Sequence, residues 1–268
     1  MRIHLQDRPI AITGAGSGIG RATALECAKA GMPVALNGRR VEKLEETAEE
    51  IKAAGGRAIV IQGDVTRIDD CEEVVAKTVE SFGPIYAIYA NAGYGIEQAM
   101  HLTADSELRS IFETNFFGCM ATLRPALTHM LEQRSGHVLM CSSAIGKIGI
   151  PYYGAYCATK ACQTIVGRAM KHELRPLGVH VTTVHPVLTK TEFAAVAQQH
   201  SGGRRMADDM PNLLVQTPQK VARATVKSLR KPKTEVWTSP MTRWAFALLI
   251  ASPRLADFAL SRAAKGKS

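Results

Sequence analysis

Residues 9–31 read PIAITGAGSGIGRATALECAKAG: a short apolar run, a glycine-rich turn, and a segment whose apolar residues have helical spacing. The run PIAIT (9–13) is typical of a buried strand, and GRATALECAKAG (20–31) is typical of a helix. A turn of this kind points backbone N–H groups at the helix N-terminus, where they bind phosphate. The stretch therefore predicts the first strand and helix of an α/β fold, with a phosphate site between them.

The turn itself is TGAGSGIG (13–20), in which Gly14, Gly18 and Gly20 form the pattern GxxxGxG. It differs from the common dinucleotide fingerprint GxGxxG, whose third glycine would fall on Ile19. Glycines allow the backbone to approach a pyrophosphate closely. A glycine-rich turn without a ligand is the alternative, but its place after the first strand favours phosphate binding.

The rest of the chain alternates short apolar runs with longer amphipathic stretches, which is the pattern of βαβ units in a parallel sheet. The expected strands are PIAIT (9–13), PVALN (33–37), AIVIQGDV (58–65), IYAIYANAG (85–93), HVLMCSS (137–143), VHVTTVHP (179–186) and, as a seventh, EVWTSP (235–240). One long helix is expected over 107–133. No linker or repeat divides this progression. Residues 1–268 therefore predict a single α/β domain: a Rossmann-like, doubly wound parallel sheet of about seven strands with helices on both faces.

The composition is that of a folded globular protein, with 46% hydrophobic residues in a chain of 268. The six cysteines show no CxxC pair, and no histidine cluster has metal-ligand spacing, so we expect reduced packing residues and no metal site. The N-terminal segment lacks the long apolar core of a signal peptide, which favours a cytoplasmic location.

The net charge of +9 arises from 33 basic and 24 acidic residues, and only the C-terminal part is locally basic. A nucleic-acid-binding protein would combine a basic stripe with a recognisable reading motif, and this sequence shows no such motif. We therefore expect no nucleic-acid partner. Anionic small ligands or a membrane surface fit the charge better.

The end of the second expected strand indicates which dinucleotide would bind. NAD-binding proteins usually place an acidic residue there to hold the ribose 2′-hydroxyl, whereas this chain has Asn37 and Gly38, followed by Arg39 and Arg40. No carboxylate would repel a 2′-phosphate, and guanidinium groups bind phosphate well. Ser17 could reach the same phosphate. The pattern favours NADP(H) over NAD(H), the alternative being that the arginines only cap the strand or face solvent.

The segment YCATK (156–160) places a phenol and an ammonium group four residues apart on an expected helix. Residues at this spacing share one helix face. An ordinary tyrosine has a pKa of about 10 and is a poor acid or base near neutrality, but a nearby ammonium group lowers that pKa. Tyr156 and Lys160 are therefore a candidate proton-transfer pair, although the same spacing also occurs on ordinary amphipathic helices.

Taken together, these features resemble the short-chain dehydrogenase/reductase family. The motifs that carry the resemblance, in the family's order and spacing, are TGAGSGIG (13–20), GDV (63–65), NAG (91–93), ETNFFG (113–118), SS (142–143) and YCATK (156–160). The likeness runs to about Glu192. It implies an NADP(H)-dependent oxidoreductase that interconverts a carbonyl and a secondary or primary alcohol on a hydrophobic small molecule, by hydride transfer. It also implies a homodimer or homotetramer.

The resemblance further implies a catalytic tetrad. Tyr156 would donate and accept the proton, and Lys160 would lower the pKa of that phenol and bind the nicotinamide ribose. Ser143, rather than Ser142, would hold the substrate oxygen. Asn115 would hold a water molecule that links Lys160 to solvent. Taken singly, Ser143 could be a helix or loop cap and Asn115 a satisfied core amide.

The implied cofactor contacts come from four segments. The glycine turn would hold the phosphates, Asp64 and Val65 would lie beside the adenine, and the NAG turn would support the sheet near the adenine ribose. After the sixth strand, Val187 replaces the family's usual glycine, which could change the path of a loop whose threonines would contact the nicotinamide. The full set is Gly14, Ser17, Gly18, Ile19, Gly20, Arg39, Arg40, Asp64, Val65, Asn91, Ala92, Gly93, Tyr156, Lys160, Thr189 and Thr191.

Two further segments lie beyond these motifs. Residues 190–216 correspond to the family's substrate lid, and their sequence does not identify the substrate. Residues 241–268 form an apolar, basic, amphipathic tail whose longest uncharged run is too short to span a bilayer. The tail either lies on a membrane surface or packs on its own domain or a neighbouring subunit. The alternative function is therefore a membrane-peripheral or cofactor-sensing binding protein with little turnover, although a sensor would be expected to have lost Tyr156 or Lys160.

Overall fold

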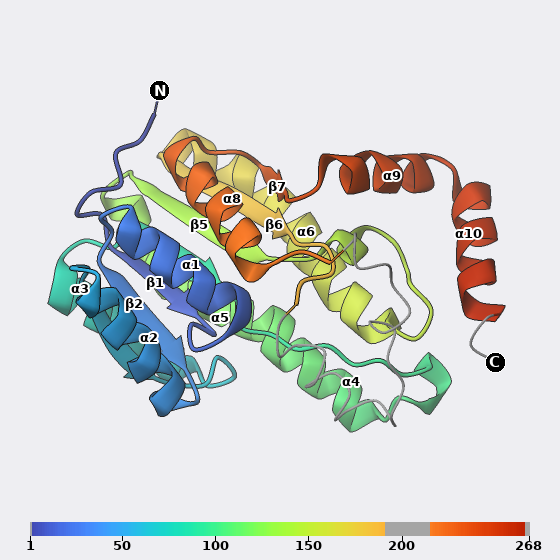
Figure 1. Cartoon of the computed structure of the whole chain (residues 1–268), viewed down its shortest axis with the longest axis horizontal. Coiled ribbons are helices and arrows are strands. Elements are labelled where there is room, and N and C mark those ends of the chain that lie inside the picture. The colour runs from blue at the N-terminus through green and yellow to red at the C-terminus, as the bar shows by residue number, and fades with distance from the viewer. Residues whose placement is uncertain (1, 191–214, 266–268) are drawn as a thin grey trace.

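The computed structural model describes residues 2–190 and 215–265, and its centre is a parallel sheet (Figure 1). In chain order the strands are β1 (Ile10–Thr13), β2 (Val34–Gly38), β3 (Ala58–Gln62), β4 (Ala87–Ala90), β5 (Gly136–Cys141), β6 (Val179–His185) and β7 (Glu235–Trp237). Their order in space is β3-β2-β1-β4-β5-β6-β7. The strand order reverses between β1 and β4, and doubly wound sheets bind their ligands at such a switch point, beyond the carboxyl ends of the strands. The predicted fold class is confirmed.

Helices cover both faces of the sheet. One face carries α1 (Gly18–Lys29), α2 (Val41–Ala53) and α8 (Pro218–Arg230), and the other carries α3 (Ile68–Phe82), α5 (Gly118–Glu132) and α6 (Gly154–Leu174). Successive side chains of a strand point to opposite faces, so Ile10 and Ile12 join the core under α1 while Ala11 joins the core on the other face. Every residue of β1 is buried. A strand buried on both faces has an unbroken apolar sequence, which explains the run PIAIT.

Residues 105–132 are helical without a break, as the expected long helix over 107–133 predicts, but a π-helical turn divides this helix into three parts. They are α4 (Asp105–Phe112), a π-helical segment η2 (Glu113–Phe117) and α5. A π-helical turn inserts a residue into the helical register and often occurs at functional sites. This one contains Asn115, which is fully buried. Because η2 contains neither proline nor glycine, its sequence does not distinguish it from an ordinary helical turn.

The C-terminal part of the chain continues from β7 into α9 (Pro240–Ala251) and α10 (Pro253–Lys265), which extend beyond the β7 edge of the sheet (Figure 1). α9 packs against α10 and against η3 (Ala144–Lys147), a short 3₁₀ helix that follows β5. Within residues 2–190 and 215–265, no helix alone has the length and apolar character needed to cross a bilayer. Taken together, α9 and Pro253–Ser261 reach that length and apolar character, but the axes of the two segments meet at a bend of 111°.

Candidate active site

Thr13 and Asn91 join the carboxyl ends of β1 and β4 at the switch point. The Thr13 hydroxyl oxygen accepts hydrogen bonds from the main-chain N–H groups of Asn91 and Ala92, at 3.1 Å each. In return, the Asn91 side-chain amide donates to the main-chain oxygen of Thr13 at 2.9 Å. Pairing between the two strands ends at Ile12 and Tyr89, so these bonds continue the connection where the strands diverge. The NAG turn thus lies directly beside the glycine turn.

The glycine turn is closed so tightly that side chains would not fit. Gly14 has a left-handed φ of 65°, and a Cβ on Gly20 would strike the carbonyl oxygen of Gly14. α1 begins at Gly18, after Ser17, and carries no acidic residue in its first turn. The first N–H groups of a helix have no intrahelical partner. This end of α1 therefore fits a phosphate group.

The two arginines that follow β2 turn to different neighbours. Nη2 of Arg40 donates to Oγ of Ser17 at 3.2 Å, beside the glycine turn. The side chain of Arg39 is 80% exposed, and its Nη1 lies 3.9 Å from Oδ2 of Asp64. The preceding Asn37 is buried and donates to the main-chain oxygen of Ile61 at 3.1 Å. The place of an acidic ribose ligand is thus taken by a core amide.

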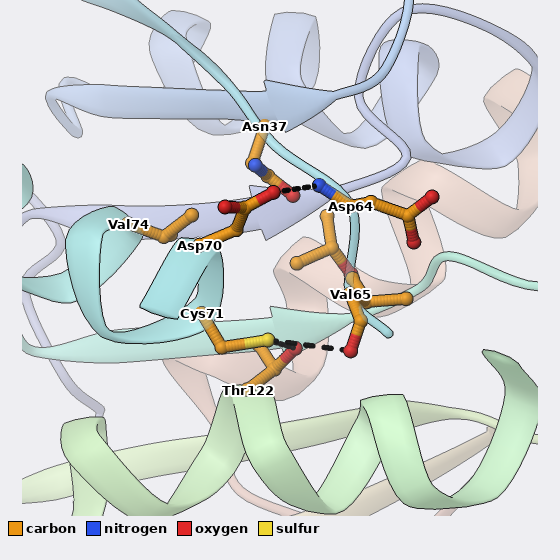
Figure 2. A pocket seen from close by; sticks show the side chains of 8 residues that line it. Asn37, Asp64, Val65, Asp70, Cys71, Val74 and Thr122 are labelled. Carbon is orange, nitrogen blue, oxygen red and sulfur yellow. Dashed lines mark hydrogen bonds between the residues drawn. The ribbon is translucent and has the colours of Figure 1, made fainter. Parts of the chain in front are cut away.

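The loop after β3 is held by the first turn of α3, as Figure 2 shows. The main-chain N–H of Asp64 donates to the Asp70 carboxylate at 2.7 Å, and the Cys71 thiol donates to the main-chain oxygen of Val65 at 3.4 Å. The Asp64 carboxylate accepts from the N–H and hydroxyl of Thr66, at 3.0 and 2.9 Å. An open pocket beside this loop is lined by Arg39, Gln62, Gly63, Asp64 and Asp70. Its position is that expected for the adenine contacts.

Asn115 ties the segment after β4 to α6. Its Oδ1 accepts from the main-chain N–H of Tyr94 at 2.9 Å, and its Nδ2 donates to the main-chain oxygen of Tyr94 at 2.8 Å. The same Nδ2 also donates to the hydroxyl of Thr159 at 3.1 Å. A Cβ on Gly93 would lie 2.8 Å from the Asn115 Oδ1. The glycine of the NAG turn therefore makes room for this buried amide.

Tyr156 lies near the start of α6 and is 8% exposed. Burial raises the pKa of its phenol well above the ordinary value, and the Cys141 thiol acts in the same direction, while a hydrogen bond with the Ser143 side chain opposes the shift in this pKa. The neighbouring Ser142 instead donates to the main-chain oxygen of Lys160 at 2.8 Å. Of the two serines, Ser143 is thus the one that the structure brings to the phenol.

The Lys160 ammonium group is buried beside Tyr156. Its Nζ lies 5.6 Å from the centre of the Tyr156 ring, and it donates to the main-chain oxygen of Cys141 at 2.7 Å. Burial lowers the pKa of Lys160, and the thiols of Cys141 and Cys119 oppose that shift. The expected lowering of the Tyr156 pKa by Lys160 is therefore not the dominant effect here, because burial disfavours the charged form of both groups.

The structure shows one further residue beside Lys160 and Asn115: Gln163, which the sequence motifs did not indicate. Its Oε1 accepts from Lys160 at 3.1 Å, and its Nε2 donates to the main-chain oxygen of Asn115 at 2.6 Å. Gln163 follows Lys160 by three residues on α6, so the two share one helix face. This three-residue spacing is the sequence signal that could have placed Gln163 next to Lys160.

Apolar side chains surround the Tyr156 ring. It forms a buried cluster with Ile96, Ile111 and Ala155. Close by, the Tyr153 hydroxyl donates to the Glu97 carboxylate at 2.6 Å, and Glu97 is 8% exposed. Burial, and next the bond to Glu97, raise the pKa of Tyr153. The wall beside Tyr156 is thus largely apolar, with one buried acid that the sequence reasoning also missed.

The loop after β6 meets the far end of the expected lid. Thr189 pairs with Gln216 in an isolated parallel bridge, and the Gln216 side chain donates to the Thr189 hydroxyl at 3.1 Å. Val187, which replaces the family's glycine, does not adopt a left-handed backbone. Thr191 and most of the expected lid (190–216) lie outside the described residues.

Comparison with known proteins gives a family and a fold. A family model described as short chain dehydrogenase matches residues 8–202. Ketoacyl reductase HetN of a Nostoc species is 30% identical over 260 residues, which cover 96% of this chain and 88% of that protein. A short chain dehydrogenase/reductase from Burkholderia phymatum, in complex with NAD, has a TM-score of 0.81 at 22% identity, covering 97% of this chain and 96% of its own. An alcohol dehydrogenase from Thermococcus sibiricus, complexed with 5-hydroxy-NADP, has a TM-score of 0.74 at 26% identity, covering 85% and 94%.

The close packing of η3 on α6 can be tested at Gly146. A Cβ there would lie 2.8 Å from the main-chain carbon and oxygen of Lys160, whereas a Cβ on Gly149 would meet nothing within 4 Å. We expect Gly146→Ala to lower the free energy of unfolding by about 1–3 kcal/mol through overpacking. The control, Gly149→Ala, should change it by less than about 0.5 kcal/mol. Urea unfolding measures both, and equal effects would contradict this packing.

Proposed function

Because this chain belongs to the short-chain dehydrogenase family, and is therefore an NAD(P)-dependent oxidoreductase, we propose that it interconverts a hydrophobic carbonyl compound and its alcohol with NADP(H). The observation that carries this proposal is the position of the buried Lys160 ammonium group, 5.6 Å from the centre of the Tyr156 ring, with the Ser143 side chain opposing the rise in the pKa of the same phenol. Tyr156 and Lys160 lie on α6, and Ser143 follows β5. All three are next to the switch point, where the glycine turn fits a dinucleotide.

The residues at the switch point fit a nicotinamide dinucleotide. The glycine turn and the start of α1 would hold its phosphates, since Gly14 and Gly20 leave no room for a side chain there. The loop at Asp64 and Val65 would contact the adenine, and Lys160 and Thr189 the nicotinamide end. When bound, the nicotinamide supplies or takes up the hydride at the reacting carbon.

The chain itself handles the proton. The Tyr156 phenol is protonated at neutral pH, as an ordinary tyrosine is, and can give its proton to a carbonyl oxygen; burial raises its pKa, so the transfer needs a group that stabilises the phenolate. Ser143 donates a hydrogen bond to the same oxygen as its negative charge grows. The Lys160 ammonium group stabilises the phenolate that remains. The apolar cluster with Ile96 and Ile111 excludes water and favours a hydrophobic substrate.

The preference for NADP(H) rests on the groups beside the glycine turn. Asn37 carries no charge that would repel a 2′-phosphate, and Arg40 already binds Ser17 at this place. Arg39 is exposed at the open pocket near Asp64. The two solved relatives contain NAD and 5-hydroxy-NADP, so the preference depends on this chain's own arginines.

We also propose that the tail, residues 241–268, contacts the anionic surface of a membrane from the cytoplasmic side. α9 exposes Met241, Trp244, Leu248 and Ile250, and Trp244 is 73% exposed. The tail contains five basic residues, Arg243, Arg254, Arg262, Lys265 and Lys267, and one acidic residue, Asp257. Two such tails would repel each other, whereas anionic headgroups attract them and tryptophan favours the membrane interface. The homodimer or homotetramer that the family resemblance implies would then assemble through other surfaces.

Removing the Tyr156 hydroxyl tests the reaction. We expect Tyr156→Phe to lower kcat by at least about 100-fold, because the proton donor is lost. Affinity for NADPH should stay unchanged, which fluorescence titration measures. Tyr86→Phe is the matched control, since the buried Tyr86 hydroxyl precedes β4 at the opposite end of the sheet. Unchanged turnover of Tyr156→Phe would exclude this proton donor. NADPH binding without turnover by the wild type would favour the cofactor-sensing alternative.

Removing a guanidinium group tests the cofactor preference. We expect Arg40→Ala and Arg39→Ala each to raise the Kd for NADPH about tenfold or more, because a charged hydrogen bond to phosphate is lost. The Kd for NADH should not change. Arg57→Ala is the control, because Arg57 directly precedes β3 at the end of the strand away from the phosphate site. Tighter binding of NADH than NADPH by the wild type would contradict the assignment.

Flotation with lipid vesicles tests the tail. We expect the wild type to float with vesicles of phosphatidylcholine and phosphatidylserine, less so at high salt, and Trp244→Glu to stay unbound. Ile165→Glu is the control, because Ile165 is 69% exposed but lies on α6. No flotation, combined with a wild-type oligomer that Trp244→Glu dissociates, would instead assign this surface to a second copy of the chain.

A further inference from the structure

Gln163 joins two members of the expected tetrad through its side chain. Its oxygen accepts from the Lys160 ammonium group at 3.1 Å and its nitrogen donates to the main-chain oxygen of Asn115 at 2.6 Å. All three residues are buried, and Gln163 is 1% exposed. An ammonium group only donates and a carbonyl oxygen only accepts. Only one orientation of the amide therefore satisfies both neighbours.

The surroundings of Lys160 hold its charge with neutral groups. Its hydrogen-bond partners are the main-chain oxygen of Cys141 on β5 and the side chain of Gln163 on α6. In the part of the chain that the structure describes, the titratable groups around it are the thiols of Cys119 on α5 and Cys141, and the Tyr156 phenol. None of these is a carboxylate. A buried cation keeps its proton only when acceptors replace the lost water.

We propose that Gln163 is a positioning residue that fixes the Lys160 ammonium group beside Tyr156 and keeps it charged. It acts through Lys160 and does not touch the substrate. Because the glutamine is neutral, it does not cancel the positive charge of Lys160 beside the phenol. This inference rests on the proposed function in one respect: Lys160 affects turnover only if Tyr156 transfers the proton.

The same contact gives Lys160 a direct connection to Asn115. The family resemblance implies that Asn115 holds a water molecule linking Lys160 to solvent, and in this chain the main-chain oxygen of Asn115 also accepts from the Gln163 amide. An amide N–H donates a hydrogen bond without ionising near neutral pH, whereas a water molecule can pass a proton on. The Gln163 contact therefore sets the geometry of the site and does not conduct protons toward Asn115.

Two substitutions in the full-length protein test this role. In Gln163→Glu, the carboxylate stabilises the ammonium form and counteracts its effect on the phenol. We expect the pKa of Lys160 to rise, and the limb of the kcat profile for alcohol oxidation that reports Tyr156 to move up by about 1 pH unit. In Gln163→Leu, the ammonium group loses an acceptor, so its pKa should fall and kcat should drop about tenfold. NMR of carbon-labelled lysine measures the pKa of Lys160, whose signal is identified by its loss in Lys160→Met.

The controls separate this role from packing. Cys162→Ser, at the neighbouring position on α6, should leave both the Lys160 pKa and the pH profile unchanged. If Gln163→Leu does not fold, the Lys160 pKa and the pH profile of Gln163→Glu alone test the role of Gln163. An unchanged Lys160 pKa and an unchanged profile in Gln163→Glu would overturn the proposal and leave Gln163 a packing residue. Absence of turnover in the wild type would overturn the proposed function instead, and the Lys160 pKa would still decide the role of Gln163.

Discussion

The hydrogen bonds between Thr13 and Asn91 are the constraint on which the site depends. At this point β1 and β4 stop pairing, and the chain must turn away from both strands without leaving buried polar groups unpaired. The Thr13 hydroxyl and the Asn91 amide satisfy those groups and hold the two turns side by side. The glycine turn then faces the start of α1, and Gly93 meets the Asn115 amide. One junction between two strands thus positions both the glycine turn and the segment that contacts Asn115.

The second constraint is that Tyr156 and Lys160 are buried with no carboxylate beside them in the described part of the chain. The pKa of Tyr156 is raised and that of Lys160 lowered, because each group is taken from water into an apolar setting. Neutral partners hold both: the Ser143 hydroxyl, the main-chain oxygen of Cys141 and the Gln163 amide. A carboxylate would hold the ammonium group more strongly but would cancel its charge. The site is therefore built to keep a protonated phenol and an ammonium group close together.

The tail is connected to this site through aromatic side chains. The Trp237 ring of β7 stacks on His185 at 4.9 Å between ring centres, and contacts Phe246 of α9 at 6.2 Å. The Nδ1 of His185 lies 3.1 Å from the main-chain oxygen of Ser143, within hydrogen-bonding distance. Two side chains, Trp237 and His185, therefore connect Phe246 of α9 to Ser143, the serine beside Tyr156. α9 also packs on η3, which follows directly after that serine.

The sequence by itself determined the strands, the fold class, the glycine turn and the family, because these depend on short-range patterns. A strand buried on both faces must be apolar throughout, and a turn closed as tightly as that of Gly14 and Gly20 must be glycine. Only the tertiary structure decided the π-helical turn at Asn115, the pairing of Arg40 with Ser17 and the contact of Gln163 with Asn115. The last two pairs lie 23 and 48 residues apart in the chain. The opposite pKa shifts of Tyr156 and Lys160 also belong to the tertiary structure, because burial depends on the packing of distant segments and not on local spacing.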